Sequence, residues 1–352
     1  MNPPNIAPRP RELAALAAVV ALGVVHAMIA PPWSDASASI LTDAVAMARG
    51  DATAFTATTW GRDGVGPAWS VAISLAVRMG ASASTVAVGL ATTAFAGAIV
   101  AAWAVARRIA PAPDWVAPLA AACIAASPVL ARHAASGLET PLLALAVLAA
   151  AWTALHEHPR VAMYTGAWLA LAAVTRVEGL TMAVLACGAL IGMGESRRRG
   201  VLALGSFVSL WFPTVVLPWI LFDALSLAPA GVLDPDPTRW GHGIAGAARA
   251  LATTGAMIGV AALAVTALRR GRDLPTVWFA AIVGTGFVLA IGAGGDALLV
   301  ERALTPALAV AAPALAPLIG DAPTPRGRAI GAFGLAAALL IPATVAGLAL
   351  GG

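Results

Sequence analysis

Long apolar runs separated by short polar segments constrain this chain more than any other feature of its sequence. A helix needs roughly 17 to 25 apolar residues to cross the hydrocarbon core of a bilayer. Candidate spans of about this length, some of them a little shorter, are 13–30, 85–106, 115–131, 141–156, 161–175, 180–194, 201–225, 246–267, 275–293, 303–320 and 329–350.

The composition agrees with so many spans. Hydrophobic residues make up 60% of the 352 residues and charged residues 11%, with a mean hydropathy of +0.87. Soluble proteins average about 25% charged residues. A soluble fold of this length has too little interior to bury so much apolar surface. The sequence therefore predicts an all-α, polytopic membrane protein.

The distribution of arginine indicates how many runs span. Every one of the 21 basic residues is Arg, and cytoplasmic loops carry the excess of basic residues. If the short apolar stretch 67–79 is an interfacial helix, eleven spans remain, and 13 Arg lie on the side of a cytoplasmic N-terminus. These are Arg9, Arg11, Arg107, Arg108, Arg160, Arg197, Arg198, Arg199, Arg269, Arg270, Arg272, Arg326 and Arg328. Counting 67–79 as a span would place the later clusters outside, so we predict eleven spans in the plasma membrane.

This topology implies one transmembrane domain over residues 1–352, with a first outer loop at 31–84 that contains interfacial helices and with no soluble C-terminal domain. A signal-peptide interpretation of 1–30 would remove a span that the topology needs. The net charge of +4 is dispersed in short clusters between apolar runs. Such clusters are typical of membrane topology, so we expect a lipid bilayer and no nucleic acid as partner.

Charged residues collect in the short loops predicted on the outer side. They are Arg132 with Glu139, Arg176 with Glu178, and Asp296 with Glu301 and Arg302. Charges at the mouths of spans are costly against lipid unless they pair or line a polar cavity. Salt bridges that fix helix ends are the alternative for any one pair, whereas three pairs on one face favour a functional cavity. His133, beside Arg132, is a further residue that could approach this cavity.

The residues around these charges form short motifs in a definite order. They are Trp33-Ser34-Asp35-Ala36, Ser136-Gly137-Leu138-Glu139-Thr140-Pro141, Thr175-Arg176-Val177-Glu178-Gly179, Gly294-Gly295-Asp296 and Glu301-Arg302. This constellation resembles the GT-C class of integral-membrane glycosyltransferases, and within it the actinobacterial arabinofuranosyltransferases that decorate cell-wall arabinan. The resemblance covers about residues 10–320. Val177 replaces the usual Pro, and only the second acid of the usual pair, Asp35, is kept.

The resemblance implies a GT-C-like fold and transfer of arabinofuranose from a polyprenyl-phosphate donor, with inversion, on the outer face of the membrane. The implied acceptor is a hydroxyl of a cell-envelope glycan or a glycoprotein. Asp35 matches the essential loop acid of the class and is the candidate catalytic base, because the attacking hydroxyl needs a base opposite the leaving group. A helix N-cap for 36–49 is the structural alternative for Asp35.

Arginine suits the departing lipid phosphate because its planar guanidinium donates two parallel hydrogen bonds. The candidate phosphate-binding residues are Arg176, Arg302 and Arg132. Three acids are candidates for orienting these Arg, binding sugar hydroxyls or sharing a divalent cation: Glu139, Glu178 and Asp296. Oxygen ligands suit Mg²⁺, Mn²⁺ or Ca²⁺, although no ligand spacing indicates a metal site.

Other functions stay open at this point. A transporter or flippase for a polyprenyl-linked sugar would need charged or broken helices near the bilayer midplane, whereas these spans are almost free of charge. A non-catalytic scaffold needs no converging charges in its outer loops. Within the enzyme class, mannose or another hexose is the alternative donor sugar.

Overall fold

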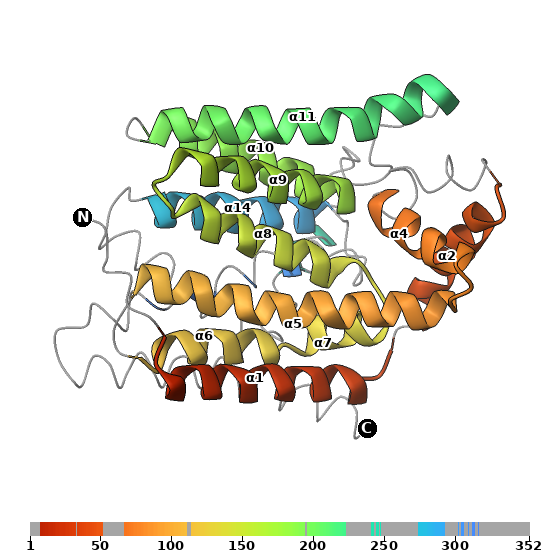
Figure 1. Cartoon of the computed structure of the whole chain (residues 1–352), viewed down its shortest axis with the longest axis horizontal. Coiled ribbons are helices and arrows are strands. Elements are labelled where there is room, and N and C mark those ends of the chain that lie inside the picture. Colours follow the sequence, from red (N-terminus) through yellow and green to blue (C-terminus); the bar gives the residue numbers. More distant parts are fainter. Residues whose placement is uncertain are drawn as a thin grey trace.

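The computed structural model shows a bundle of α-helices (Figure 1). It describes residues 8–32, 34–51, 67–110, 114–193, 196–222, 241–242, 244–245, 247, 274–292, 302, 304–305, 309, 312–313 and 316. Every regular element within these ranges is a helix, and the prediction of an all-α membrane fold is confirmed. The predicted span 329–350 lies outside the described residues, as do 246–267 apart from Ala247 and much of 303–320.

Consecutive helices of the bundle run back and forth and pack side by side. The helices are α1 Pro10–Ile29, α2 Ser34–Ala48, α4 Pro67–Arg78, α5 Ala83–Ile109, α6 Val116–Ala125, α7 Pro128–Ala135, α8 Thr140–Ala154, α9 Pro159–Thr175, α10 Val177–Gly192, α11 Arg197–Phe222 and α14 Leu274–Gly292. Helix α5 packs against α8 and α6, and α9 packs against α8, α10 and α11. Helix α14 lies against α10, and α1 covers α5 and α6 (Figure 1).

Small side chains let these helices approach one another closely. Helices within a bilayer gain little from burying apolar surface against each other, so van der Waals contact between small residues carries much of the packing. A Cβ atom at Gly166 of α9 would lie 2.2 Å from the carbonyl oxygen of Ala203 in α11. Helix α5 presents one buried face of alanines at three- and four-residue spacing: Ala87, Ala91, Ala94, Ala98 and Ala102.

The span predicted at 115–131 is broken in the structure. Helix α6 ends at Ala125, α7 begins at Pro128, and the two are bent by 53°. Pro128 has no N–H to continue the hydrogen-bond ladder, and its ring crowds the preceding turn. The Ser127 hydroxyl caps the new helix by accepting from the Leu130 N–H at 3.4 Å.

This break changes the position of the following residues. Arg132 and His133, predicted in an outer loop at 132–140, lie on helix α7 instead. Among the described residues, α1 and α5 are each long and apolar enough to cross a bilayer, and the bent pair α6–α7 adds a third, broken span. Helices α8, α10 and α14 contribute shorter apolar segments. The total of eleven spans stays a prediction.

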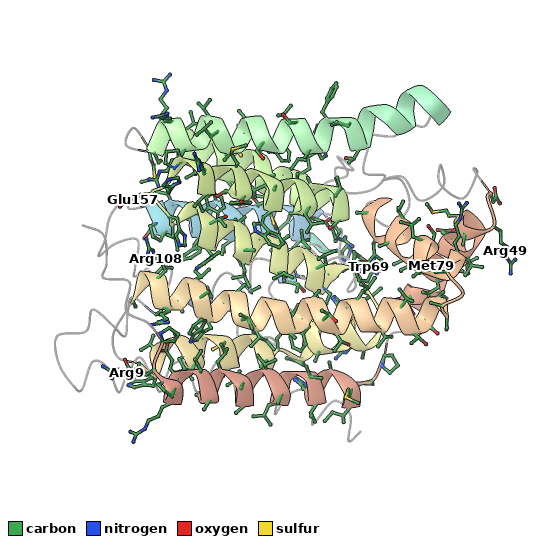
Figure 2. The ribbon with its side chains drawn as sticks, viewed as in Figure 1. Arg9, Arg49, Trp69, Met79, Arg108 and Glu157 are labelled. Atoms are coloured by element: carbon green, nitrogen blue, oxygen red, sulfur yellow. The ribbon has the colours of Figure 1, made fainter. Side chains whose placement is uncertain are left out.

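The two ends of the bundle carry different residues. Figure 2 shows Arg9, Arg108 and Glu157 at one end and Trp69, Met79 and Arg49 at the opposite end. The first end includes the ion pairs between Arg9 and Asp114 and, at 3.3 Å, between Arg107 and Glu12. The sequence predicts this end to be cytoplasmic, and that orientation remains a prediction.

Helices α2 and α4 cover the opposite end of the bundle. They pack against each other and against α5, and α4 also reaches α9 (Figure 1). The Arg78 guanidinium donates to the carbonyl of Ala48, at 3.1 Å from Nε, and so caps the end of α2. A 12-residue helix is only about 18 Å long, too short to cross the bilayer. The chain therefore folds 67–78 as a short non-spanning helix, as the arginine distribution predicts.

Candidate active site

The turn between α7 and α8 is a Schellman helix end. Gly137 has a φ of +68°, in the left-handed region that favours glycine. The Leu138 N–H donates to the His133 carbonyl at 3.0 Å, and the Gly137 N–H donates to the Ala134 carbonyl at 3.1 Å. These are the two hydrogen bonds that define the motif. Glu139 follows at once as the N-cap residue of α8, so the turn determines where this carboxylate lies.

Helices α4 and α5 hold the turn in place. Trp69 of α4 is 2% exposed, and its indole N–H donates to the Gly137 carbonyl at 3.1 Å. A Cβ atom at Gly137 would lie 2.8 Å from the Cβ of Ala87 on α5. The short helix of the first outer loop and the α7–α8 turn therefore form one packed unit.

Arg176 is the single residue between α9 and α10. It has extended backbone angles, φ −155° and ψ 152°, as the C-cap of one helix and the N-cap of the next. A Cβ atom at Gly179 would lie 2.0 Å from the carbonyl oxygen of Ala172, so glycine is needed for this close return of the chain. The tight junction leaves the Arg176 side chain with no exposed surface.

Two carboxylates surround the Arg176 guanidinium. Its Nε donates to Oε2 of Glu178 at 2.9 Å, and its Nη2 donates to Oε1 of the same carboxylate, which makes a bidentate pair. Its Nη1 donates to Oε1 of Glu139. Both acids are buried. The structure thus brings Glu139, Arg176 and Glu178 together from two different helix junctions as buried ion pairs at helix ends, and a functional cavity here stays a prediction.

Two further arginines belong to this charge cluster. Arg302 is 2% exposed, and Arg132 is half-buried. Burial alone would raise the pKa of Glu139, but the guanidinium groups of Arg302 and Arg176 outweigh it and hold that pKa below its ordinary value. Glu139 is therefore a carboxylate at neutral pH. Among the charged groups near His133, Arg302 has the strongest electrostatic interaction with its imidazole.

The described charge cluster contains three arginines, Arg132, Arg176 and Arg302, and two acids, Glu139 and Glu178. Guanidinium groups suit a phosphate, which arginine binds with two parallel hydrogen bonds. Asp296 and Glu301, which the sequence also predicts here, lie outside the described residues.

Asp35 lies in the first turn of α2, the helix against which α4 packs. The helix begins at Ser34, two residues earlier than the segment that Asp35 was considered to cap. Asp35 therefore lies inside the first turn, where the helix dipole favours a carboxylate. The catalytic role and the N-cap alternative both stay predictions.

The described residues do not make a divalent-cation site from the acids of the cluster. No group of three His, Cys, Asp or Glu within the described ranges could hold a metal ion. Both oxygens of Glu178 and one oxygen of Glu139 accept hydrogen bonds from Arg176. Within the described residues, Arg176 therefore takes three of the four carboxylate oxygens of Glu139 and Glu178.

The sequence interpretation missed two features of this site. Trp69 is not among the predicted site residues, because its hydrogen bond to Gly137 comes from tertiary packing. The break between α6 and α7 had a local signal, because Ser127-Pro128 is a helix-start pattern within an apolar run. A search for internal helix starts would have placed Arg132 and His133 on a helix.

Comparison of the fold with solved structures shows what it resembles. The crystal structure of ArnT from Cupriavidus metallidurans bound to undecaprenyl phosphate superimposes with a TM-score of 0.62 and 16% sequence identity. The match covers 92% of this chain and 62% of that one, so the chain spans less than two thirds of the length of ArnT. The fold of this chain is therefore GT-C-like.

Two other solved structures resemble the fold of this chain less closely, with TM-scores below 0.5. The Saccharomyces cerevisiae protein O-mannosyltransferase Pmt1–Pmt2 complex bound to the sugar donor gives a TM-score of 0.44 at 15% identity, over 64% of this chain and 36% of that one. The Archaeoglobus fulgidus oligosaccharyltransferase in the apo form gives 0.49 at 13% identity, over 94% and 54%. No protein-family model matches the sequence, and no curated protein sequence matches it.

Proposed function

We propose that this chain is a membrane glycosyltransferase that moves a sugar from a polyprenyl-phosphate donor to an acceptor hydroxyl, with inversion, at the outer face of the plasma membrane. One observation carries the proposal. A GT-C-like fold places a buried cluster of arginines and glutamates at the end of the bundle that α2 and α4 cover. The sugar we propose is arabinofuranose, and the acceptor is a cell-envelope glycan or glycoprotein.

The chemistry assigns a role to each part of the site. Asp35 accepts the proton of the acceptor hydroxyl, whose oxygen attacks the anomeric carbon opposite the phosphate. The bond from that carbon to the phosphate oxygen breaks, and polyprenyl phosphate leaves as an anion. Arg302 and Arg132 stabilise the developing negative charge, as guanidinium groups do at transferring phosphates. Arg176, also predicted as a phosphate-binding residue, would do so while bonded to Glu139 and Glu178.

Buried charges near one end of the bundle favour an enzyme over a flippase. A transporter site lies at charged or broken helices near the bilayer midplane. The break described between α6 and α7, at Ala126 and Ser127, has no charged residue within it. Here Arg176 joins the ends of two helices, and Glu139 lies at the start of a third. A reaction site at the membrane surface suits a lipid-linked donor, whose phosphate lies at that depth.

The test is a transfer assay with membranes that contain the full chain. Radiolabelled polyprenyl-phosphate arabinofuranose and polyprenyl-phosphate mannose are supplied in parallel, and label in the glycan or glycoprotein fraction is measured. We expect label from the arabinofuranose donor, and loss of that label in the Asp35→Asn variant. Label from mannose alone would support the same reaction with a hexose. Membranes that transfer neither sugar, but move the labelled lipid between leaflets, would overturn the enzyme proposal in favour of a flippase.

A further inference from the structure

Three buried polar side chains beside the α7–α8 turn have no hydrogen-bond partner within the described part of the chain. They are His133, at both ring nitrogens, Glu139, at Oε2, and Thr140, at Oγ1. All three side chains lie in residues with 0% exposure. An unsatisfied buried polar group is destabilising, because it has lost its hydrogen bonds to water and gained none in return. Three such groups in one segment therefore call for a physical reason.

The turn folds the segment that carries these three groups back on itself, through the Schellman hydrogen bond from the Leu138 N–H to the His133 carbonyl. The side chains of His133 and Glu139 also interact electrostatically. Arg176 holds Oε1 of Glu139, which leaves Oε2 as a free acceptor. Arg302 interacts electrostatically with both Glu139 and His133.

The chemistry of the three groups matches the hydroxyls of a sugar. A neutral imidazole has one donor and one acceptor, a threonine hydroxyl has both, and a carboxylate oxygen only accepts. A sugar hydroxyl donates and accepts at once, so neighbouring hydroxyls on a ring can satisfy all of these atoms. The phosphodiester of a lipid-linked sugar has no proton to donate at neutral pH and would be repelled by Oε2 of Glu139.

We propose that His133, Glu139 and Thr140 form a subsite for the hydroxyls of a sugar ring, and that His133 determines its specificity. This subsite deepens the proposed function and rests on it. The donor sugar and the acceptor glycan offer the same hydroxyl chemistry, and the experiment distinguishes them. Because all three groups are covered in this structure, a sugar reaches them only when the packing over the turn opens.

The test variant is His133→Leu in the purified full chain. Leucine fills a comparable volume without the two unsatisfied nitrogens, so the thermal midpoint without ligand should stay the same or rise slightly. Binding is then measured for bare undecaprenyl phosphate, polyprenyl-phosphate arabinofuranose, polyprenyl-phosphate mannose and an arabinofuranosyl oligosaccharide. We expect His133→Leu to weaken a sugar-bearing ligand at least about tenfold, the scale of one buried hydrogen bond. Affinity for bare undecaprenyl phosphate should not change.

Two further variants separate binding from structure. His133→Gln keeps a donor and an acceptor and should recover part of the lost affinity. His26→Leu is the matched control, because His26 lies on α1 and its Nδ1 is 3.0 Å from the Ala125 carbonyl oxygen. This control should leave the affinity for every sugar ligand unchanged.

Each outcome has a definite meaning. Weaker binding of a lipid-linked sugar assigns the subsite to the donor, and weaker binding of the oligosaccharide alone assigns it to the acceptor. Equal sugar affinities in the wild type and His133→Leu, or a His133→Leu midpoint several degrees lower without ligand, would overturn the subsite and leave the proposed function standing. A wild-type chain that binds no lipid phosphate at all would overturn the proposed function, and the subsite with it.

Discussion

Arg176 is fully buried and shares its positive charge with two carboxylates, so its first effect is on the stability of the fold. Desolvation makes a buried ion pair a weak source of net stability, but removing one partner leaves the other charges uncompensated. Arg302 and Arg132 belong to the same charge cluster. At the residue scale, the loss of Arg176 should leave two buried carboxylates without the hydrogen bonds that it donates to them.

Replacing Arg176 by Leu should lower the free energy of unfolding by about 3–5 kcal/mol, because Glu139 and Glu178 then lose their counter-charge. The triple variant Arg176→Leu, Glu139→Gln, Glu178→Gln should recover much of this loss. The measurement is the thermal midpoint in detergent. A single variant as stable as the wild type would show that the network does not stabilise the fold.

Replacing Arg302 by Lys tests phosphate binding with little change in charge. Lysine keeps the positive charge but loses the planar fork, so we expect weaker use of the polyprenyl-phosphate donor, seen as a higher KM, with the fold intact. Arg176→Lys should reduce the midpoint as well, because it loses the bidentate bond to Glu178. Unaltered donor kinetics in both variants would contradict the assignment of these arginines to the phosphate.

Asp35→Asn tests the catalytic base. An amide of similar shape cannot take the proton of the acceptor hydroxyl, so turnover should fall at least about 10²-fold. Asp35 lies in the first turn of α2, where losing its charge costs about 0.3–1 kcal/mol, so the fold should persist. Transfer and thermal midpoint are measured on the same preparation. Near wild-type transfer by the Asn variant would make Asp35 structural and direct the search for the base to Asp43, Asp63 and Asp296.

At the scale of elements, the α7–α8 turn is the part of the fold on which the position of Glu139 depends. Gly137 is the left-handed residue of this turn, and its carbonyl accepts the indole hydrogen bond from α4. The same residue packs closely against α5. The junction at Arg176 depends likewise on the missing side chain of Gly179. Both glycines are needed because backbones approach each other there.

Gly137→Ala should therefore destabilise the fold and impair transfer together. The left-handed backbone alone costs about 1 kcal/mol with alanine, and the new Cβ would lie 2.8 Å from the Cβ of Ala87. Gly50→Ala is the matched control, because Gly50 also has a positive φ, +90°, but no atom within 4 Å of the new Cβ. We expect a clearly larger fall in midpoint for Gly137→Ala. Equal effects of the two variants would show that packing at the turn contributes nothing.

At the scale of the whole molecule, the ends of the bundle define which face meets the donor and acceptor. Arg49 and Trp69 lie at the end with the charge cluster, and Glu157 lies at the other (Figure 2). Arg49 and Glu157 are both exposed. The arginine distribution predicts that the Arg49 end faces outward.

Cysteine labelling in intact cells checks this orientation. Cys123 and Cys187 are first replaced by Ala, and Arg49→Cys and Glu157→Cys are then made singly. An impermeant thiol reagent should label Arg49→Cys and leave Glu157→Cys unlabelled until the membrane is opened. The reverse pattern would invert the topology and place the reaction on the cytoplasmic side.

The sequence by itself determined that this protein lies in a lipid bilayer, that it is all-α, and which charged residues are candidates for the site. Apolar runs of span length exclude a soluble fold, because so much apolar surface cannot be hidden within 352 residues. The polar residues between the runs are few, so Glu139, Arg176, Glu178 and Arg302 could be singled out from their positions at helix ends. The short helix at 67–78 followed from the arginine distribution alone.

Only the tertiary structure decided how those residues combine. Hydropathy averages over a window, so it does not register the break at Pro128 that carries Arg132 and His133 onto α7. Nor does spacing along the chain tell which of several carboxylates an arginine will bond. Arg176 is bonded to a residue 2 positions away and to another 37 positions away, because two helix junctions meet in space. Partner choice in a buried charge cluster depends on distance and desolvation, and packing between helices sets both.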